Sequence, residues 1–138
     1  MTTQITLDLA QGYAETVEFV FHEPARCVVG RAPDCDIHLP VEAGHGDVSR
    51  HHCVFEIDPP RIRVRDLGSL NGTYVNGTRI GHGSDTPPHD SYGLPTFEEF
   101  ELWDGDEVRV GKTTIHVGIG VPEEEKEGFL FPAGLMLP

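Results

Sequence analysis

Positively charged residues are scarce in this chain of 138 residues, which has 10 lysines and arginines against 23 aspartates and glutamates. The formal net charge of −13 argues against a nucleic-acid ligand or an anionic membrane surface, because both are bound through accumulated lysine and arginine. Long apolar runs are missing as well, and no stretch approaches the roughly 18 residues of a membrane helix. The first residues lack the basic and apolar regions of a signal peptide. We therefore expect a cytoplasmic protein.

Cysteine is equally sparse, with Cys27, Cys35 and Cys53 as the three residues of this type. An odd number without a paired C-x-x-C spacing does not fit a disulfide framework, and it suits small buried side chains in a reducing compartment. We predict that all three cysteines are structural.

Histidine is abundant by contrast, with eight residues, and the grouping of His45, His51, His52 and Cys53 raises the question of a metal site. Neighbouring strand residues point to opposite faces, so His52 and Cys53 do not readily chelate one ion. The spacing also lacks the paired separations of structural zinc sites. We predict no metal and no cofactor.

Alternation of apolar and polar residues dominates the chain and predicts strands with one buried face. No window has the apolar face of a helix, and Gly, Pro and Asn separate the strands, so the pattern indicates an all-β sandwich or barrel. The predicted apolar positions are Ile5, Leu7 and Leu9; Val17, Phe19 and Phe21; Cys27 to Val29; Cys53, Phe55 and Ile57; Ile62 and Val64; Phe100 and Leu102; Val108 and Val110; and Ile115, Val117 and Ile119.

The length and the 38% of hydrophobic residues fit one domain with one core. We place this domain at residues 1–121, with an extended loop at 81–97 that is rich in Gly, Pro, Ser, Asp and His. Residues 122–138 are an acidic and then apolar tail, which either packs along the domain or presents a short apolar peptide to a partner. Trp103 is expected in the core or as cover for a sheet edge. We expect a monomer.

Residues 49–77 have two alternating strands between polar loops. The short connection Asp58-Pro59-Pro60 folds the chain back, so that Ser49 and Arg50 lie on the same rim as the Asn71-Gly72 turn. Asn76-Gly77 predicts a tight hairpin after it, because both residues tolerate positive φ. We expect the function to lie on this rim.

Arg61, Arg63 and Arg65 alternate with Ile62 and Val64 and give this strand a basic outer face. Exposed charge is the usual state of arginine, so we interpret the three as a solvated face. A binding patch is the alternative interpretation.

Five polar motifs follow one another along the chain: Gly30-Arg31, Asp36-Ile37, Ser49-Arg50-His51-His52, the run from Asp66 to Gly77 (D-L-G-S-L-N-G-T-Y-V-N-G), and the run from Asp104 to Gly111 (D-G-D-E-V-R-V-G). In this order and at these spacings they resemble the forkhead-associated (FHA) domain family, whose members recognise phosphothreonine. The resemblance covers roughly residues 5–119 and implies a β-sandwich of two mostly antiparallel sheets, with the binding loops at one rim.

A phosphothreonine carries about −1.5 to −2 charges near neutral pH and three acceptor oxygens, so its site needs donors and a fixed positive charge. The resemblance implies that Arg31 and Ser49 contact the phosphate, with Arg50 as an additional contact. Arginine suits this role because its planar fork of donors matches phosphate geometry. Asn71 is implied to hold the peptide main chain through an amide that both donates and accepts.

The resemblance also implies residues that support the site. His52 supports the loop from behind without touching the ligand, and Gly30 and Gly72 shape the loops. Leu70 stands where many relatives have a hydroxyl-bearing residue. We count Leu70 among the phosphopeptide-binding residues and expect one phosphate donor fewer there.

These residues predict a phosphothreonine-dependent peptide- or protein-binding module in Ser/Thr-kinase signalling, with a phosphothreonine-containing protein as partner. The alternative is an FHA-like interaction domain that no longer needs phosphate and uses a sheet face, the 81–97 loop or the 122–138 tail. We do not expect an enzyme, because Ser49 and His52 lack an evident orienting acid and oxyanion donors.

Overall fold

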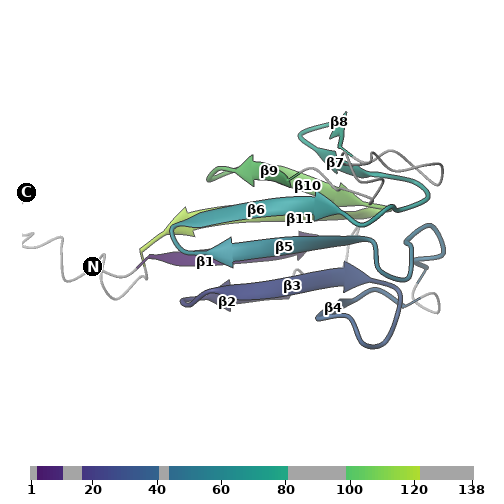
Figure 1. Ribbon diagram of the computed structural model, residues 1–138, viewed down its shortest axis with the longest axis horizontal. Helices are drawn as coiled ribbons and strands as arrows, with labels where there is room; N and C mark the ends of the chain where they lie inside the picture. The colour runs from purple at the N-terminus through teal and green to yellow at the C-terminus, as the bar shows by residue number, and fades with distance from the viewer. Residues whose placement is uncertain (1–2, 11–16, 41–43, 81–98, 122–138) are drawn as a thin grey trace, which may run out of the picture.

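The computed structural model describes residues 3–10, 17–40, 44–80 and 99–121, which form strands, turns and loops (Figure 1). The predicted loop at 81–97 and the predicted tail at 122–138 lie outside these residues. In the described part of the chain, no helix is long and apolar enough to cross a membrane. The strands are β1 (Gln4–Ala10), β2 (Val17–Phe21), β3 (Ala25–Gly30), β4 (Ile37–His38), β5 (Cys53–Asp58), β6 (Arg61–Asp66), β7 (Thr73–Val75), β8 (Thr78–Arg79), β9 (Glu99–Leu102), β10 (Glu107–Val110) and β11 (Thr113–Gly120).

The strands form two sheets that lie one over the other (Figure 1). The six-stranded sheet has the order β2-β1-β11-β10-β7-β8, and the five-stranded sheet has the order β4-β3-β5-β6-β9. Neighbouring strands are antiparallel except for β3 and β4, which are parallel over two residues. The predicted sandwich of two mostly antiparallel sheets is confirmed.

The core lies between the sheets and follows the predicted alternation. Ile5, Leu7 and Leu9 of β1 are at most 3% exposed, and they face the inner side chains of the five-stranded sheet, such as Phe55 at 0%. Burying each aliphatic side chain of this size contributes about 1.5–3 kcal/mol to stability. The three cysteines are buried with free thiols, as predicted. Burial raises the pKa of the Cys27 thiol to about 12.

One predicted core position, Val17, is wrong, and the first of the two places expected for Trp103, the core, is excluded. Val17 is 50% exposed, because β2 is an edge strand of the six-stranded sheet and buries its inner face only in part. Trp103 is 63% exposed and does not lie in the core, since it begins the turn between β9 and β10. In that turn its backbone N–H donates to the Asp106 carboxylate at 2.8 Å.

The outer face of the five-stranded sheet holds the three arginines of β6 in ion pairs with glutamates on the same sheet. This agrees with an ordinary charged face, because each positive charge has a carboxylate beside it. Arg26 on β3 is paired in the same way. The pairs are Arg26–Glu56 at 3.1 Å, Arg61–Glu101 at 3.0 Å, Arg63–Glu99 at 3.4 Å and Arg65–Glu56 at 2.9 Å.

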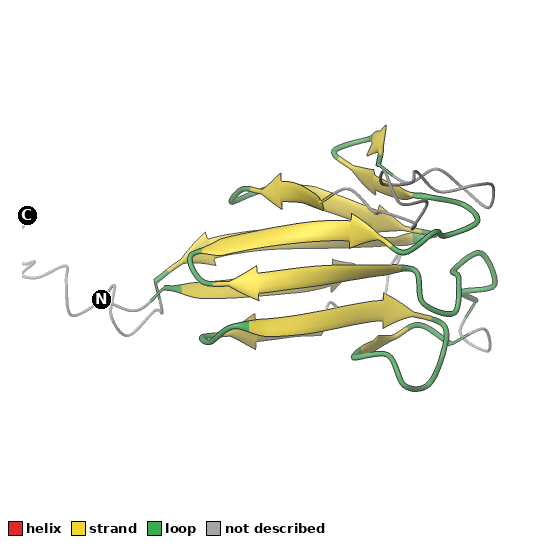
Figure 2. Cartoon of the chain, viewed as in Figure 1, coloured by secondary structure: helices red, strands yellow, loops and turns green. Residues whose placement is uncertain are grey.

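The turns decide which loops meet. The turn at Pro59-Pro60 reverses the chain between β5 and β6, so the loop before β5 and the loop after β6 lie at the same end of the sandwich. The loop between β3 and β4 lies at that end too, at the right of Figure 2. Asn76 and Gly77 have φ of 50° and 86°, which confirms the predicted hairpin between β7 and β8.

Candidate functional site

The segment 49–52 is fastened to the loop between β3 and β4 by backbone hydrogen bonds. The backbone N–H of Arg31 donates to the Ser49 carbonyl at 3.0 Å, and that of Ala32 donates to the Arg50 carbonyl at 3.0 Å. Gly30 makes this close approach possible, because a Cβ there would lie 2.1 Å from the carbonyl oxygen of Arg50. The loop that carries Arg31 and the segment that carries Arg50 therefore form one unit.

The side chain of Arg31 is held in place by its own loop partner. Its Nε donates to the carbonyl oxygen of Val48 at 3.0 Å, and the residue is half-buried. The Arg31 guanidinium also carries two terminal amino groups, each with two donors. Fixing the inner end of a guanidinium reduces the rotamer entropy that a ligand contact would cost.

Ser49 connects this unit to the loop between β6 and β7. Its Oγ accepts a hydrogen bond from the backbone N–H of Leu70 at 3.0 Å. A hydroxyl that accepts from a backbone donor still has its own proton to donate. The bond also brings Leu70 beside Ser49, where the Leu70 side chain is 60% exposed.

His52 lies behind the same two loops and is fully buried. Its Nδ1 accepts the backbone N–H of Ser49 at 3.0 Å, and its Nε2 lies 2.9 Å from the carbonyl oxygen of Gly72. Burial lowers the pKa of this imidazole below its ordinary value. One neutral ring therefore joins the Ser49 loop to the turn after Asn71.

Asn71 is exposed on the rim, and its amide nitrogen donates to the carbonyl oxygen of Asp47 at 2.9 Å. The amide oxygen remains an acceptor and the amide nitrogen has a second proton, so the group can pair with a peptide main chain. Gly72 follows with φ of 88°, a conformation that favours glycine, and a Cβ there would lie 2.5 Å from Nε of Arg79. The turn therefore requires glycine at position 72.

Sequence reasoning missed the group that shapes this turn, the buried carboxylate of Asp66. It accepts hydrogen bonds from the backbone N–H groups of Gly68 and Ser69 at 2.9 Å, and from the hydroxyls of Ser69 and Thr73. The Ser69 hydroxyl in turn accepts the backbone N–H of Gly72 at 3.0 Å. A signal was present in the sequence, because Asp two residues before Gly-Ser is typical of a turn in which the carboxylate accepts hydrogen bonds from the backbone that follows it.

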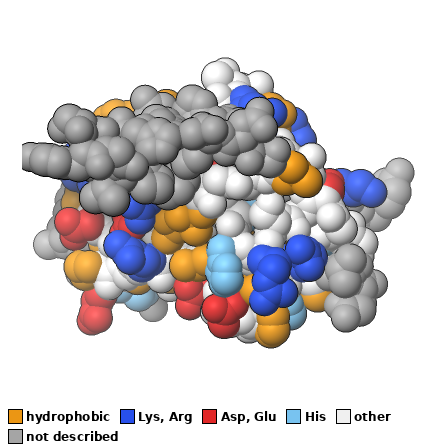
Figure 3. All heavy atoms as spheres, turned by 45° about the vertical axis from the view of Figure 1, so that its right-hand side comes forward, with side chains coloured by type: hydrophobic (Ala, Val, Ile, Leu, Met, Phe, Trp, Pro, Cys, Tyr) orange, Lys and Arg blue, Asp and Glu red, His pale blue; other side chains and the backbone are white. Residues whose placement is uncertain are grey.

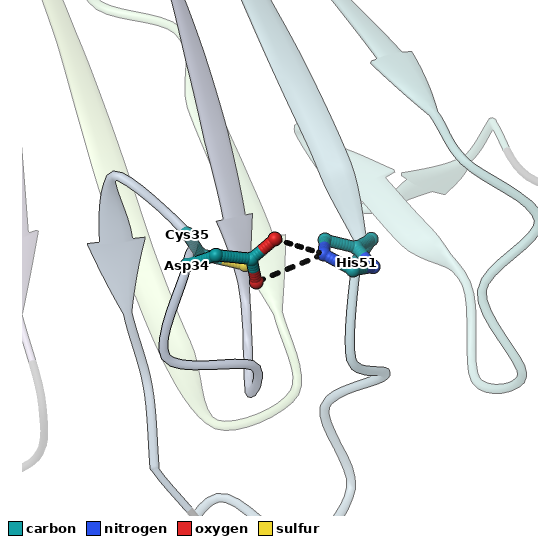
Figure 4. A group of neighbouring side chains, drawn as sticks. All are labelled: Asp34, Cys35 and His51. Atoms are coloured by element: carbon teal, nitrogen blue, oxygen red, sulfur yellow. Dashed lines mark hydrogen bonds and ion pairs between the residues drawn. The ribbon is translucent and has the colours of Figure 1, made fainter.

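A further contact joins the loop between β3 and β4 to segment 49–52, through Asp34 and His51 (Figure 4). Nε2 of His51 lies 3.1 Å from both carboxylate oxygens of Asp34, and this hydrogen bond lowers the pKa of Asp34. With Cys35 they bring three metal-ligand atoms within 4.8 Å of one another. The Cys35 thiol donates to the Arg50 carbonyl at 3.2 Å and burial raises its pKa, whereas metals bind the thiolate. The observed bonds give this group a role in connecting the loops.

The predicted site residues therefore gather at one end of the sandwich. Arg31, Ser49, Arg50, Leu70 and Asn71 lie on the rim, while Gly30, His52 and Gly72 lie within or behind its loops. Arg50 is exposed. In Figure 3 this end is turned forward, and lysine or arginine side chains gather beside a histidine on the visible face.

Comparison with known proteins agrees with this arrangement. The FHA domain model matches residues 27–91. The chain is 36% identical over 99 residues to the glycogen accumulation regulator GarA of Mycobacterium tuberculosis, covering 72% of this chain and 48% of that protein. It is also 36% identical over 94 residues to the oxoglutarate dehydrogenase inhibitor of Corynebacterium efficiens, covering 68% of this chain and 51% of that protein. The chain thus spans about half the length of these curated relatives.

The chain is also similar to solved structures of FHA domains, over nearly the whole length of those domains. An FHA domain from a study of phosphothreonine-dependent FHA interactions superposes with a TM-score of 0.59 and 27% identity, covering 83% of this chain and 95% of the other. The FhaA FHA domain, solved in complex with the intracellular domain of Rv3910, superposes with a TM-score of 0.58 and 28% identity, covering 82% and 98%. By its loop motifs, its two-sheet fold and these similarities, the chain belongs to the forkhead-associated domain family.

Proposed function

We propose that this chain binds a phosphothreonine-containing segment of a partner protein in Ser/Thr-kinase signalling. The observation that carries the proposal is that Arg31, Ser49 and Asn71 come from three different loops and lie on one rim, joined by hydrogen bonds that fix their positions. A fixed guanidinium and a hydroxyl beside it are what a phosphate dianion needs.

In this proposal each side chain has a separate task. The terminal amino groups of Arg31 and the hydroxyl of Ser49 donate to the phosphate oxygens, and Arg50 adds a second positive charge from an exposed position. Asn71 pairs with the peptide main chain next to the phosphothreonine. His52, Gly30 and Gly72 hold the loops and do not touch the ligand. Leu70 lies on the rim beside Ser49.

Binding rather than catalysis is part of the proposal. Two relatives are named as a regulator and as an inhibitor, and the family members among the solved structures are described by what they bind. We propose that this chain likewise acts as a monomeric, non-enzymatic module in the cytoplasm, where three free thiols suit the reducing environment.

The proposal is tested with one synthetic peptide in two forms, with phosphothreonine and with threonine, titrated by calorimetry. We expect measurable binding of the phosphorylated form alone. Arg31→Ala should cost about 2–5 kcal/mol of binding free energy, as removal of one partner of a close charge pair does. Arg50→Ala should cost less, because an exposed charge is screened by water and salt.

Arg26→Ala is the matched control, because Arg26 lies in an exposed ion pair with Glu56 on the outer face of the five-stranded sheet. It should leave phosphopeptide affinity unchanged. Equal affinity for the phosphorylated and unphosphorylated peptides would contradict the proposal and favour an interaction domain that does not need phosphate.

A further inference from the structure

Strand β2 forms an edge of the six-stranded sheet and lacks the usual protection of a free edge. Among the described strands, β1 is its one neighbour. Alternate backbone N–H and C=O groups of an antiparallel edge strand point away from that neighbour and can pair with a further strand. Natural edges are blocked by lysine, proline or a β-bulge. The sequence of β2 is V-E-F-V-F, and its register with β1 continues over five residues without a bulge.

The side chains of β2 leave apolar surface uncovered on both faces of the sheet. Val17, Phe19 and Phe21 lie on the inner face, opposite the core side chains of β1. Even so, Val17 is 50% exposed, and the two phenylalanines pack against the core only in part. On the outer face Val20 is 42% exposed. An edge of this kind favours association with another apolar strand.

A hollow of about 310 Å³ lies at the end of β2, where the chain turns toward β3. It is lined by residues 20–25, which include the apolar side chains of Val20, Phe21, Pro24 and Ala25. An apolar cavity of about 150 Å³ is large enough to hold a benzene molecule. The hollow therefore has room for an aromatic side chain.

Strand β11 ends close to this edge. Its last residue, Gly120, pairs with Gln4 at the start of β1, and Phe21 at the end of β2 pairs with Ile5. The ends of β11 and β2 therefore lie at the same end of the sandwich, at the left of Figure 1 and opposite the candidate site. Neighbouring strands are about 4.8 Å apart, so a new strand beyond β2 is about 14 Å from β11.

The chain that follows β11 has the length and the composition to reach this edge. Residues 122–127 contain four glutamates and one lysine, and residues 128–138 contain the run Phe129-Leu130-Phe131. Both ranges lie outside the described residues. The eight residues from Gly120 to position 128 span up to about 26 Å when extended, which exceeds the distance of about 14 Å.

We propose that Phe129-Leu130-Phe131 pairs with the free edge of β2 as a short antiparallel strand. The direction follows from the end at which the segment arrives, since the chain meets the edge beside Phe21 and then runs back along β2. Pro132 comes next and cannot donate a backbone hydrogen bond, which an edge strand tolerates. This surface is separate from the candidate site, so the proposal does not depend on phosphopeptide binding.

The pattern of apolar residues selects one register. With Phe129 opposite Phe21 and Phe131 opposite Phe19, Leu130 lies opposite Val20. Directly opposite residues share a face, so the two added phenylalanines cover the inner face and Leu130 covers Val20 on the outer face. In this register Phe129 is also the aromatic side chain next to the hollow. A shift of two residues along β2 would instead place Leu130 opposite a charged residue, Glu18.

Charge and tethering favour this segment over other occupants of the edge. Glu18 and Glu23 are exposed there, so they repel the acidic residues 122–127 and leave the apolar part to dock. A second copy of the chain would bring another net charge of −13. A segment of the same chain is present at an effective concentration in the millimolar range and has no such cost.

Hydrogen exchange of the full chain, followed by nuclear magnetic resonance, tests the proposal. Backbone N–H groups of residues 129–131 that face β2 should exchange about tenfold or more slowly than those of a free peptide with the same sequence. The N–H groups of β2 that point to the free edge should show similar protection. Nuclear Overhauser contacts between Leu130 and Val20 should confirm the register.

The double variant Phe129→Ser and Phe131→Ser should remove the protection of both segments. The matched control, Leu135→Ser with Met136→Ser, also removes two apolar side chains from residues 128–138 and should leave the protection unchanged. Val20→Lys should act like the phenylalanine variant, because lysine at an edge opposes strand addition. The dispersed resonances of core residues show that each variant is folded.

Three results would overturn the proposal. The first is exchange of residues 129–131 at the rate of the free peptide in the natural protein. The second is protection of the β2 edge that survives in the Phe129→Ser and Phe131→Ser variant. The third is protection that disappears on dilution while sedimentation shows a dimer, which would assign the edge to a second copy of the chain.

Discussion

The imidazole of His52 and the carbonyl oxygen of Gly72 are hydrogen bonded at 2.9 Å across twenty positions of the chain. The direction of this bond follows from the other ring nitrogen. Nδ1 lies 3.0 Å from the backbone nitrogen of Ser49, whose N–H can only donate, so Nδ1 is unprotonated. Nε2 therefore carries the proton and donates to Gly72. The two ligand-facing loops depend on one neutral, buried ring.

The first prediction is that acidification loosens this connection. A second proton on Nδ1 would face the Ser49 N–H, and burial already lowers the pKa of His52 below its ordinary value of 6.5. As pH falls, the unfolded chain therefore takes up this proton before the folded chain does. The stabilisation by neutral His52 is complete above about pH 6.5 and is lost progressively below it.

Urea unfolding of the free protein between about pH 7.5 and 5.5 measures this effect without the titration of the phosphate, whose second pKa is near 6. His52→Gln should lower stability at neutral pH and show a weaker loss on acidification than the natural protein. Thr78→Gln, at an exposed position on β8, exchanges one uncharged side chain for another, so it is the control and should keep the natural pH dependence. Equal pH dependence in the natural protein and His52→Gln would refute the prediction.

The second prediction concerns the carboxylate of Asp66. Asp66→Ala removes the acceptor of four hydrogen bonds and leaves buried donors in the turn unpaired. We expect a loss on the order of 3 kcal/mol in the free energy of unfolding, together with weaker phosphopeptide binding because the Asn71 turn is no longer fixed. Asp8→Asn, on the outer face of β1, should change neither by more than about 0.5 kcal/mol.

Asp66 also shows where sequence reasoning reaches its limit. The buried strands were predictable because period two records one face of a sheet, and the two-sheet arrangement followed from the family motifs. The motif run from Asp66 to Gly77 was visible as well. Which of its members face inward to hold the turn, and which face the ligand, depends on backbone geometry that the order of residues does not contain.

Val17 and Trp103 show a second limit. Apolar residues in a strand pattern predict burial, but the degree of burial depends on which strand becomes an edge and where a turn begins. β2 has one neighbouring strand, and Trp103 precedes a turn that is fixed by Asp106. Neither the strand order nor the turn geometry can be recognised from the residues next to Val17 or Trp103 in the sequence.

The third prediction follows from the position of Leu70. Its backbone N–H is bonded to Oγ of Ser49, so the side chain at position 70 begins next to the phosphate contact and is exposed there. Leu70→Thr should add a hydroxyl donor and raise phosphopeptide affinity by about 0.5–1.5 kcal/mol, the net value of a typical hydrogen bond. Calorimetry with one phosphothreonine peptide measures the change.

Leu70→Val is the matched control, since it has the branched shape of threonine without the hydroxyl. Equal affinities of the Leu70→Thr and Leu70→Val variants would show that no phosphate oxygen lies within reach of position 70.

The last prediction is selectivity for phosphothreonine over phosphoserine. Both residues present the same phosphate to Arg31 and Ser49, so charge does not distinguish them. The extra methyl group of threonine does, if it is buried against an apolar wall, since burying one such group contributes about 0.8 kcal/mol, a factor of about four. Branching at the β-carbon adds to this preference, because phosphothreonine loses less rotamer freedom on binding.

The backbone hydrogen bond from Leu70 to Ser49 puts a residue with an exposed apolar side chain beside the phosphate contact. Titration of one peptide, synthesised with each phosphoresidue and measured in the same buffer and salt, should therefore show at least a several-fold preference for phosphothreonine. Leu70→Ala should narrow this ratio, because it removes most of the wall while the phosphate contacts remain. If the natural protein binds both peptides equally, there is no methyl pocket beside Ser49, and phosphate recognition by Arg31 then operates without discrimination between the two residues.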